Sequence, residues 1–149
     1  MKDEPDSPIE LRARALRLLA RREHSRAELG RKLAPRSESP QALEFLLLEL
    51  EKRNQLSDER FSSERARVLS RKYGAARIRQ DLKAKGVDAQ VIDGVSSEGD
   101  LERARAILDR KYRAPAATRE ERAKRMRFLK GRGFSSEIIF KLLSARGER

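Results

Sequence analysis

The sequence predicts an all-α protein, built as an elongated array of three tandem three-helix modules. Leu, Ile, Val and Ala recur at helical spacing along the chain, and no alternating run of β-branched residues predicts a strand. Segments of the middle third also recur in the last third, which is typical of repeat proteins. The chain has 149 residues, of which 40% are charged and 5% aromatic, so thin apolar layers between short helices are favoured over one large core.

The first module is expected at residues 8–54, after an acidic, disordered segment at residues 1–7. Ser25 is followed three residues later by Glu28, which is the pattern of a capping box. The expected N-caps of its three helices are Ser7, Ser25 and Ser39, and the expected helix ends lie near Glu23, Pro35 and Arg53.

The second and third modules are expected at residues 55–96 and 97–149. Ser57 should cap the first helix of the second module, and Gly86 should end its second helix. Thr118 and Glu121 have the spacing of another capping box. The six helices are expected at about residues 58–72, 75–85, 88–95, 98–112, 119–133 and from 136 onward.

An internal repeat relates these two modules. The segment 82–87 (LKAKGV) is matched by 129–134 (LKGRGF), 47 positions later. The segment 64–67 (ERAR) likewise recurs at 102–105. Each module alone is too small for a stable core, so we expect it to be buried partly against its neighbour.

The net charge of +12, from 36 Lys and Arg against 24 Asp and Glu, attracts polyanions. Residues 60–85 hold nine basic and two acidic side chains, and residues 103–132 hold twelve and three. Nucleic acid, or a complex that contains it, is therefore the expected partner class. The alternative is a solvated helical surface in an arginine-rich proteome, where the arginine excess reflects codon bias.

A basic strip along the second and third modules is expected to contact phosphate or a protein partner. On the helix near residues 75–85, Ile78 and Leu82 should define the buried side. Arg77 and Lys83 should then face solvent and, with Lys85 at the helix end, tolerate charge reversal without disturbing the core. The expected contact residues are Arg65, Arg67, Arg71, Lys72, Arg77, Arg79, Lys83, Lys85, Arg103, Arg105, Arg110, Arg125 and Arg127.

Three of the residues in this region have two interpretations. Arg65 falls on the same helical stripe as the apolar side chain of Phe61, so it either extends past the core to solvent or lies on a stripe that faces a partner. Tyr73 and Tyr112 follow basic residues, and they either pack at module junctions or stack on nucleobases.

Composition and motifs argue against an enzyme. The chain has no Cys and one His, which excludes a thiolate metal site, a disulfide and a pair of imidazole ligands. We expect His24 to be a surface residue, and Asp58 and Glu59 to favour a helix dipole. No nucleotide-binding or zinc motif is present, so no cofactor or metal is expected.

The sequence also bears on location and assembly. Residues 1–10 contain no apolar run, and no stretch approaches the about 18 apolar residues of a membrane span. We therefore expect a soluble, cytoplasmic protein without a membrane partner, and a monomer.

Three consecutive segments carry a resemblance to a known family. They are residues 56–61 (LSDERF), 71–78 (RKYGAARI) and 81–87 (DLKAKGV). In order and spacing they resemble the central signature of the bacterial RecX regulatory proteins. Residues 24–29 (HSRAEL) are similar to the N-terminal module of that family, and residues 128–142 to its C-terminal module. The resemblance covers about residues 10–145.

Several positions depart from the family pattern. Asn54 and Gln55 stand where a Gly and a bulky residue are usual, and Ser57 and Ser62 stand where Asp and Ala are common. The link at residues 113–118 is also short. These departures concern local turn geometry.

The resemblance implies a cytoplasmic modulator of the RecA recombinase, mainly an inhibitor. Such a protein lies in the groove of the RecA–DNA filament and alters its extension, ATP hydrolysis and strand exchange. The implied partners are the RecA filament and, more weakly and with salt dependence, single- and double-stranded DNA. The alternative from another class is a stand-alone DNA- or RNA-binding helical repeat, which would bind bare DNA tightly and lose affinity steeply with salt.

Overall fold

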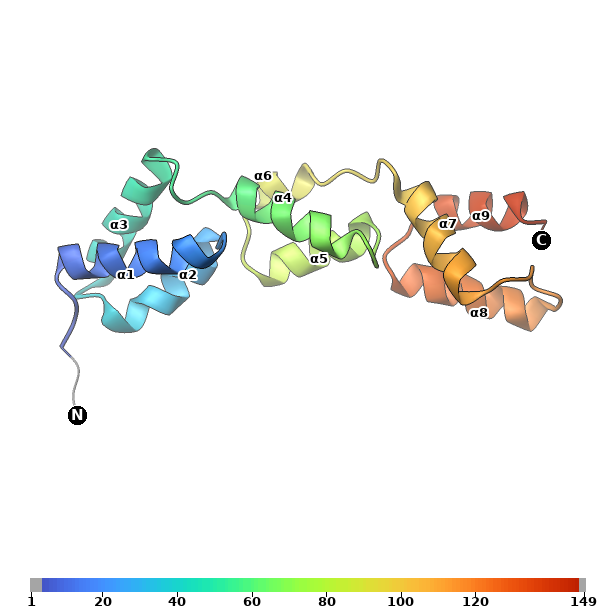
Figure 1. Ribbon diagram of the computed structural model, residues 1–149, viewed down its shortest axis with the longest axis horizontal. Coiled ribbons are helices and arrows are strands. Elements are labelled where there is room, and N and C mark those ends of the chain that lie inside the picture. Colours follow the sequence, from blue (N-terminus) through green and yellow to red (C-terminus); the bar gives the residue numbers. More distant parts are fainter. Residues whose placement is uncertain (1–3, 148–149) are drawn as a thin grey trace. The chain divides into compact units, whose positions relative to one another are not determined.

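The computed structural model describes residues 4–147, and these form nine α-helices, one short 3-10 helix and no strand (Figure 1). The all-α prediction is confirmed. By its internal contacts the chain divides into two compact units: Met1–Glu64 with Leu82–Ile92, and Arg65–Asp81 with Asp93–Arg149. The division passes through the second predicted module, so half of that module packs with each neighbour.

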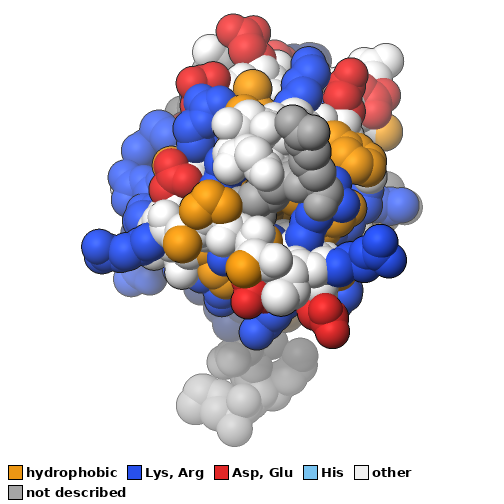
Figure 2. All heavy atoms as spheres, turned by 90° about the vertical axis from the view of Figure 1, so that its right-hand side faces the viewer, with side chains coloured by type: hydrophobic (Ala, Val, Ile, Leu, Met, Phe, Trp, Pro, Cys, Tyr) orange, Lys and Arg blue, Asp and Glu red, His pale blue; other side chains and the backbone are white. Residues whose placement is uncertain are grey.

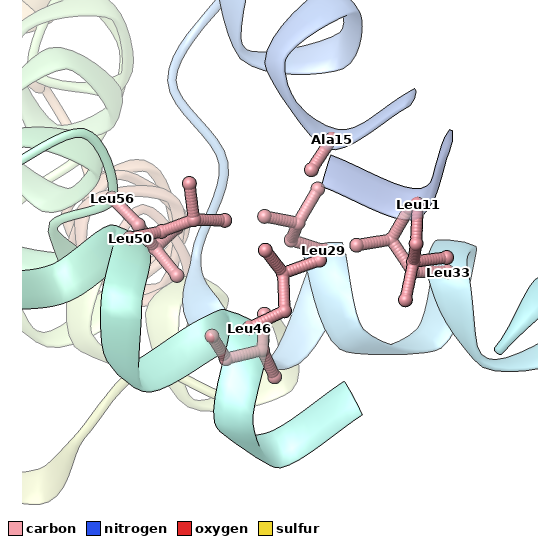
Figure 3. Packing of buried hydrophobic residues seen from close by; sticks show 8 residues of the cluster. Leu11, Ala15, Leu29, Leu33, Leu46, Leu50 and Leu56 are labelled. Atoms are coloured by element: carbon pink, nitrogen blue, oxygen red, sulfur yellow. The ribbon is translucent and has the colours of Figure 1, made fainter. Parts of the chain in front are cut away.

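The first unit has a core of leucines (Figure 3). Leu29, Leu33 and Leu50 are fully buried in it, and Leu11 and Ala15 approach them from the first helix. The elements that supply this core are α1 (Pro8–Arg21), α2 (Arg26–Leu33), the 3-10 helix η1 (Ala34–Arg36) and α3 (Pro40–Lys52). Their order and ends agree with the predicted helices to within two residues.

All three predicted N-caps in this region are confirmed. The hydroxyls of Ser7, Ser25 and Ser39 each accept a hydrogen bond from the backbone N–H three residues later. The predicted capping box at Ser25 is half formed, because the Glu28 carboxylate accepts hydrogen bonds from the Arg22 guanidinium. A charge-assisted bond to arginine is stronger than one to a neutral backbone N–H.

The middle helices are α4 (Asp58–Leu69), α5 (Ala75–Ala84) and α6 (Ala89–Asp93). All three are shorter than predicted, α5 by a single residue. Near the end of α4, the Ser70 hydroxyl donates to the Arg67 carbonyl, a local bond that competes with helix continuation. Gly94 follows α6 directly, and glycine is a poor helix former.

The second unit contains α7 (Asp100–Lys111), α8 (Arg119–Gly131) and α9 (Ser136–Ala145). Their core is centred on Leu108, Leu129 and Leu142, which are fully buried. Thr118 caps α8 as predicted, but the Glu121 carboxylate accepts the N–H of Ala117 rather than that of Thr118. The predicted capping box is therefore displaced by one residue.

The junction of the first and second modules joins the end of α5 to the start of α2. The Ser25 hydroxyl donates to the Lys85 carbonyl at 2.9 Å. Gly86 has φ +75°, and a Cβ atom there would lie 2.5 Å from the Cβ of Ala27. The close approach and the positive φ both require glycine.

The junction of the second and third modules repeats this arrangement, with Arg132 and Gly133 standing 47 residues after Lys85 and Gly86. The Gly74 N–H donates to the Arg132 carbonyl at 2.8 Å. Gly133 has φ +95°, and a Cβ atom there would lie 2.4 Å from the Cβ of Arg77. The sequence repeat thus corresponds to a repeated contact, in which the end of one module's second helix packs on the start of the preceding module's second helix.

Candidate nucleic-acid and partner interface

The structure divides the thirteen predicted contact residues by the partners of their side chains. Five of them are exposed, and within residues 4–147 their side chains donate no hydrogen bond and form no ion pair. These five are Arg71, Lys72, Lys83, Arg110 and Arg127. They are the predicted contacts best placed to reach a phosphate.

Two of these exposed cations occupy repeated positions. Arg71 follows α4 and Arg110 lies in the last turn of α7, each two residues before a tyrosine. Cations near a helix C-terminus interact favourably with the helix dipole, which gives them a structural role as well. Their exposure leaves the guanidinium groups accessible to an external anion.

Arg125 does not belong with them. Its residue is 7% exposed, and its Nη1 donates to the Ala114 carbonyl at 2.7 Å. Its guanidinium carbon also lies 4.3 Å from the centroid of the Tyr112 ring. In this structure the Arg125 side chain holds the 112–118 link against α8, and a ligand contact of Arg125 stays a prediction that its burial does not favour.

Arg65 forms a bidentate ion pair with Asp81. Its Nε and Nη2 donate to the two carboxylate oxygens at 2.8 and 3.0 Å. The expectation of an arginine extending past the core is therefore refined, because the guanidinium ends on a carboxylate of α5. Fork-to-fork pairing of this kind fixes geometry as well as charge.

Three further predicted contacts also bond within the chain. Arg79 donates to the Val95 carbonyl at 2.6 Å, and Arg105 makes a long, exposed pair with Glu102 at 3.5 Å. Arg103 donates to both Asp100 and the Glu98 carbonyl. Arg67 is exposed but interacts within the chain, and Lys85 is half-buried.

Arg77 is exposed, yet it is part of the second junction. Its Nη1 donates to the Gly131 carbonyl at 2.9 Å, and its guanidinium carbon lies 4.5 Å from the Tyr73 ring centroid. Its backbone and Cβ also face Gly133. Arg77 faces solvent as predicted, but an acidic side chain could make neither interaction, so we now expect charge reversal there to disturb the junction.

The two tyrosines are held by cations of their own chain. Arg77 and Arg132 both lie near the Tyr73 ring, at 4.5 and 5.5 Å from its centroid. Tyr112 packs edge-on against Phe128, with ring centroids 6.2 Å apart. These contacts support the interpretation of both rings as packing residues rather than as platforms for nucleobases.

His24 is buried, with 1% of its surface exposed, so the prediction of a surface histidine is wrong. Its Nδ1 lies 3.1 Å from the Arg22 carbonyl oxygen and its Nε2 lies 3.0 Å from the Lys32 ammonium. The ring therefore donates from Nδ1 and accepts at Nε2 in its neutral form. Desolvation by burial lowers the pKa of His24 below 6.5.

Glu28 lies beside this histidine. Two hydrogen bonds from Arg22 lower the pKa of the Glu28 carboxyl to about 2. Among residues 4–147, no three His, Asp or Glu side chains are grouped so that they could hold a metal ion. The cluster around His24 is thus a packed set of charge-assisted bonds.

The basic side chains are spread over the displayed face rather than gathered at one point. Figure 2 shows Lys and Arg side chains on all sides of that face, with Asp and Glu between them. A continuous basic strip along the chain stays a prediction.

Within the part of the chain that the structure describes, no helix is long and apolar enough to cross a membrane.

Comparisons with known proteins match this architecture module by module. The family models described as the first, second and third three-helix domains of RecX match residues 12–46, 57–95 and 98–143. Their number and order confirm the prediction of three three-helix modules.

Curated relatives match over nearly their whole length. The regulatory protein RecX of Herbaspirillum seropedicae is 45% identical over 138 residues, which is 91% of this chain and 90% of the relative. That of Neisseria gonorrhoeae strain FA 1090 is 40% identical over 131 residues, which is 87% of this chain and 86% of the relative.

Solved structures show the same fold. The crystal structure of RecX from Lactobacillus salivarius has a TM-score of 0.84 at 18% identity, and covers 94% of this chain and 96% of that one. A second crystal structure, of a regulatory protein RecX, has a TM-score of 0.74 at 22% identity, and covers 93% and 73%. With three consecutive family domains and close curated relatives along its length, the chain belongs to the RecX family of regulatory proteins.

Proposed function

We propose that this chain regulates the RecA recombinase, mainly as an inhibitor, by binding in the groove of the RecA–DNA filament. The observation that carries the proposal is the match of three consecutive RecX domains, together with relatives named regulatory protein RecX at up to 45% identity. The family resemblance of the central segments implies RecA as the target.

The charge distribution supports a target that contains nucleic acid. The net charge is +12, and the side chains of Arg71, Lys72, Arg110 and Arg127 have no partner of their own within the described residues. A positive field raises the rate of encounter with a polyanion, and each Lys or Arg that neutralises a phosphate releases a bound counterion. A filament groove that holds DNA offers such phosphates.

We propose that regulation results from occupancy of the groove. A chain of three modules joined by repeated, hydrogen-bonded junctions can contact a filament at several points at once. Multiple weak contacts of this kind add up to tight binding when their spacing fits the target. Bound copies would then oppose the filament's extension and its ATP hydrolysis.

The decisive experiment is a titration of the purified full chain into the cognate RecA on single-stranded DNA, with ATP hydrolysis and filament length followed together. We expect both to fall at sub-stoichiometric to equimolar ratios of the chain to RecA. A folded chain that leaves hydrolysis, filament growth and strand exchange unchanged at near-physiological salt would contradict the proposal.

The alternative is a stand-alone DNA- or RNA-binding protein that does not act through RecA. The exposed cations of the second and third modules favour it, since they would serve a bare nucleic acid equally well. Affinity separates the two functions. A RecA regulator binds the filament more tightly than the same DNA without RecA, whereas a stand-alone binder prefers the bare strand.

A further inference from the structure

The first module carries an unusual gathering of exposed apolar side chains. Ile9 on α1 and Phe45 and Leu48 on α3 are 82%, 67% and 45% exposed. Ile9 and Phe45 border a groove of about 360 Å³, whose floor includes Leu11 and Leu46. Large apolar side chains gathered around a hollow commonly mark an interaction surface.

The charge of this groove is opposite to that of the chain. Three acidic side chains line it, Asp6, Glu38 and Glu49, although the whole chain is at +12. Asp6 is paired with Arg14 and Arg36, and Glu49 with Arg53, whereas Glu38 has no partner within the described residues. One cation, Arg12, also lines it. The groove therefore presents an apolar centre with a mainly acidic rim, which we call the acidic groove.

The third module presents the complementary combination. Phe140 on α9 is 52% exposed and borders a hollow of about 260 Å³, together with Arg127 and Lys130 of α8. The Arg122 guanidinium lies 6.0 Å from the centroid of its ring. Helix α8 carries six basic and two acidic residues. We call this surface, an exposed aromatic ring among cations, the Phe140 surface.

We propose that the acidic groove of one copy binds the Phe140 surface of a second copy, so that copies associate head to tail. Both surfaces have an apolar centre that is costly to leave in water, and their rims carry opposite charges. A second copy is favoured over an unrelated basic protein because both halves of the contact are present on this chain. The inference does not depend on RecA.

When two copies associate through unlike surfaces, the resulting dimer still has one unoccupied acidic groove and one unoccupied Phe140 surface. Further copies can then add, so the association produces open chains rather than closed dimers. The apolar area at each surface is small, which predicts weak association in dilute solution. Copies concentrated along a polyanion would meet more often, and binding there would become cooperative.

The test compares self-association of the full chain with that of two single variants. Sedimentation equilibrium measures the weight-average mass at low salt, over protein concentrations up to about 1 mM, where association with a Kd of about 1 mM becomes detectable. We expect the mass of the parent chain to rise with concentration from 17.1 kDa to beyond that of a dimer. Phe45→Asp damages only the acidic groove, and Phe140→Asp damages only the Phe140 surface. Each variant alone should remain a monomer.

Mixing the two variants gives the specific signature. Phe140→Asp keeps an intact acidic groove and Phe45→Asp keeps an intact Phe140 surface, so an equimolar mixture should form dimers and nothing larger. Val68→Asp is the matched control, because Val68 is 50% exposed but lies on neither surface. It should associate like the parent chain. The charge variants Glu38→Lys and Lys130→Glu provide a second pair that leaves both aromatic rings in place.

Three results would overturn the inference. The parent chain could remain a monomer over the whole concentration range. One of the aspartate variants could associate as strongly as the parent chain while its circular dichroism spectrum stays helical. Association would then occur between two identical surfaces. The mixture of variants could also remain monomeric, which would show that the acidic groove and the Phe140 surface do not bind each other. Binding of the acidic groove to a basic helix of another protein, without self-association of this chain, would likewise contradict the inference.

Discussion

The carboxylate of Asp100 accepts a hydrogen bond from the backbone N–H of Ala75 at 3.0 Å. Asp100 is the first residue of α7, and Ala75 is the first residue of α5. The first backbone N–H groups of a helix have no partner within the helix, and a carboxylate there also interacts favourably with the helix dipole. The third module thus caps a helix of the second.

The junction of the first and second modules has the same kind of cap. Asp58 is the first residue of α4, and its carboxylate accepts the N–H of Arg26, the first residue of α2, at 2.7 Å. Its other oxygen accepts the N–H of Asp88 at 3.0 Å. In both junctions, therefore, the aspartate that begins one module's first helix caps the second helix of the module before it.

Replacing Asp100 should destabilise the chain strongly. Asp100→Ala leaves the buried N–H of Ala75 without an acceptor and removes one of the two acceptors of Arg103. We expect the free energy of unfolding to fall by about 2 to 3 kcal/mol. Urea unfolding followed by circular dichroism measures this. Glu102→Ala, at an exposed position on the same helix, should change it by no more than about 0.5 kcal/mol; equal effects of the two changes would contradict the proposed cap.

The glycine at the second junction offers a contrast between neighbours. Gly133→Ala introduces a Cβ at φ +95°, 2.5 Å from the backbone nitrogen of Arg77, and should lower the free energy of unfolding by at least about 2 kcal/mol. Gly131→Ala meets no atom within 4 Å and lies at the end of α8. It should leave stability unchanged or raise it by up to about 1 kcal/mol. Thermal melting of both variants tests the difference, and a Gly133→Ala chain as stable as the parent would argue against the close junction.

The features that the sequence predicts well are local. Ser7, Ser25 and Ser39 are N-caps because the bond that each makes spans three residues, a distance that the sequence displays directly. Helix periodicity and the 47-residue repeat are visible for the same reason. The fold class and the number of modules follow from such signals alone.

The roles of individual charges depend on contacts between distant segments. Arg125 and Arg127 are two residues apart on α8, yet one is buried against Tyr112 and the other is exposed. Asp58 has the composition of an ordinary first-turn acid, and nothing in its neighbourhood indicates that it bonds residues 32 positions before it and 30 positions after it. His24 precedes a helix cap, but its burial depends on how α1 and α2 close around it. Sequence patterns therefore identify the basic segments without separating structural arginines from accessible ones.

Arg125 and Arg127 should accordingly respond in opposite ways to the same substitution. Arg125→Met removes the bond to the Ala114 carbonyl and the contact with the Tyr112 ring, and should lower the free energy of unfolding by about 1 to 2 kcal/mol. Arg127→Met should change it by no more than about 0.5 kcal/mol while weakening DNA binding. Chemical unfolding and fluorescence anisotropy with labelled DNA measure the two effects. An Arg127→Met chain that is destabilised as much as Arg125→Met would contradict this division.

Protonation of His24 should make stability depend on pH. Because burial lowers the pKa of His24 below 6.5, the unfolded chain binds this proton at a higher pH than the folded chain does. The free energy of unfolding should therefore be constant above about pH 7, decrease as the pH falls from about 6.5 to the folded-state pKa of His24, and level off below it. Glu28, with its pKa lowered to about 2 from 4.5, adds its own loss only below pH 4.5.

The variant His24→Gln isolates this effect, since its side chain does not titrate. We expect its stability to be flat between about pH 5 and 7, where the parent chain shows a slope. Urea unfolding at a series of pH values compares the two. A parent chain without a slope in this range would show that the folded and unfolded histidines bind the proton equally well.

The last prediction concerns where the phosphate contacts lie. The variant in which Arg71, Lys72, Arg110 and Arg127 are changed to Gln removes four exposed cations that have no partner within the described residues. On single-stranded DNA, the slope of log K against log salt concentration should become shallower by about 0.7 for each phosphate that is no longer neutralised, and so by up to about 3 for all four. Fluorescence anisotropy with single-stranded DNA over a salt series measures this slope.

The matched control changes four exposed cations of the first module to Gln. They also lack partners within the described residues, and they are Arg17, Arg21, Arg31 and Lys52. This control removes the same charge and should weaken binding through the long-range field while leaving the slope nearly unchanged. If the slope becomes equally shallow in the two variants, the phosphate-binding residues are not concentrated in the second and third modules; if it changes in neither, these side chains only keep the surface hydrated.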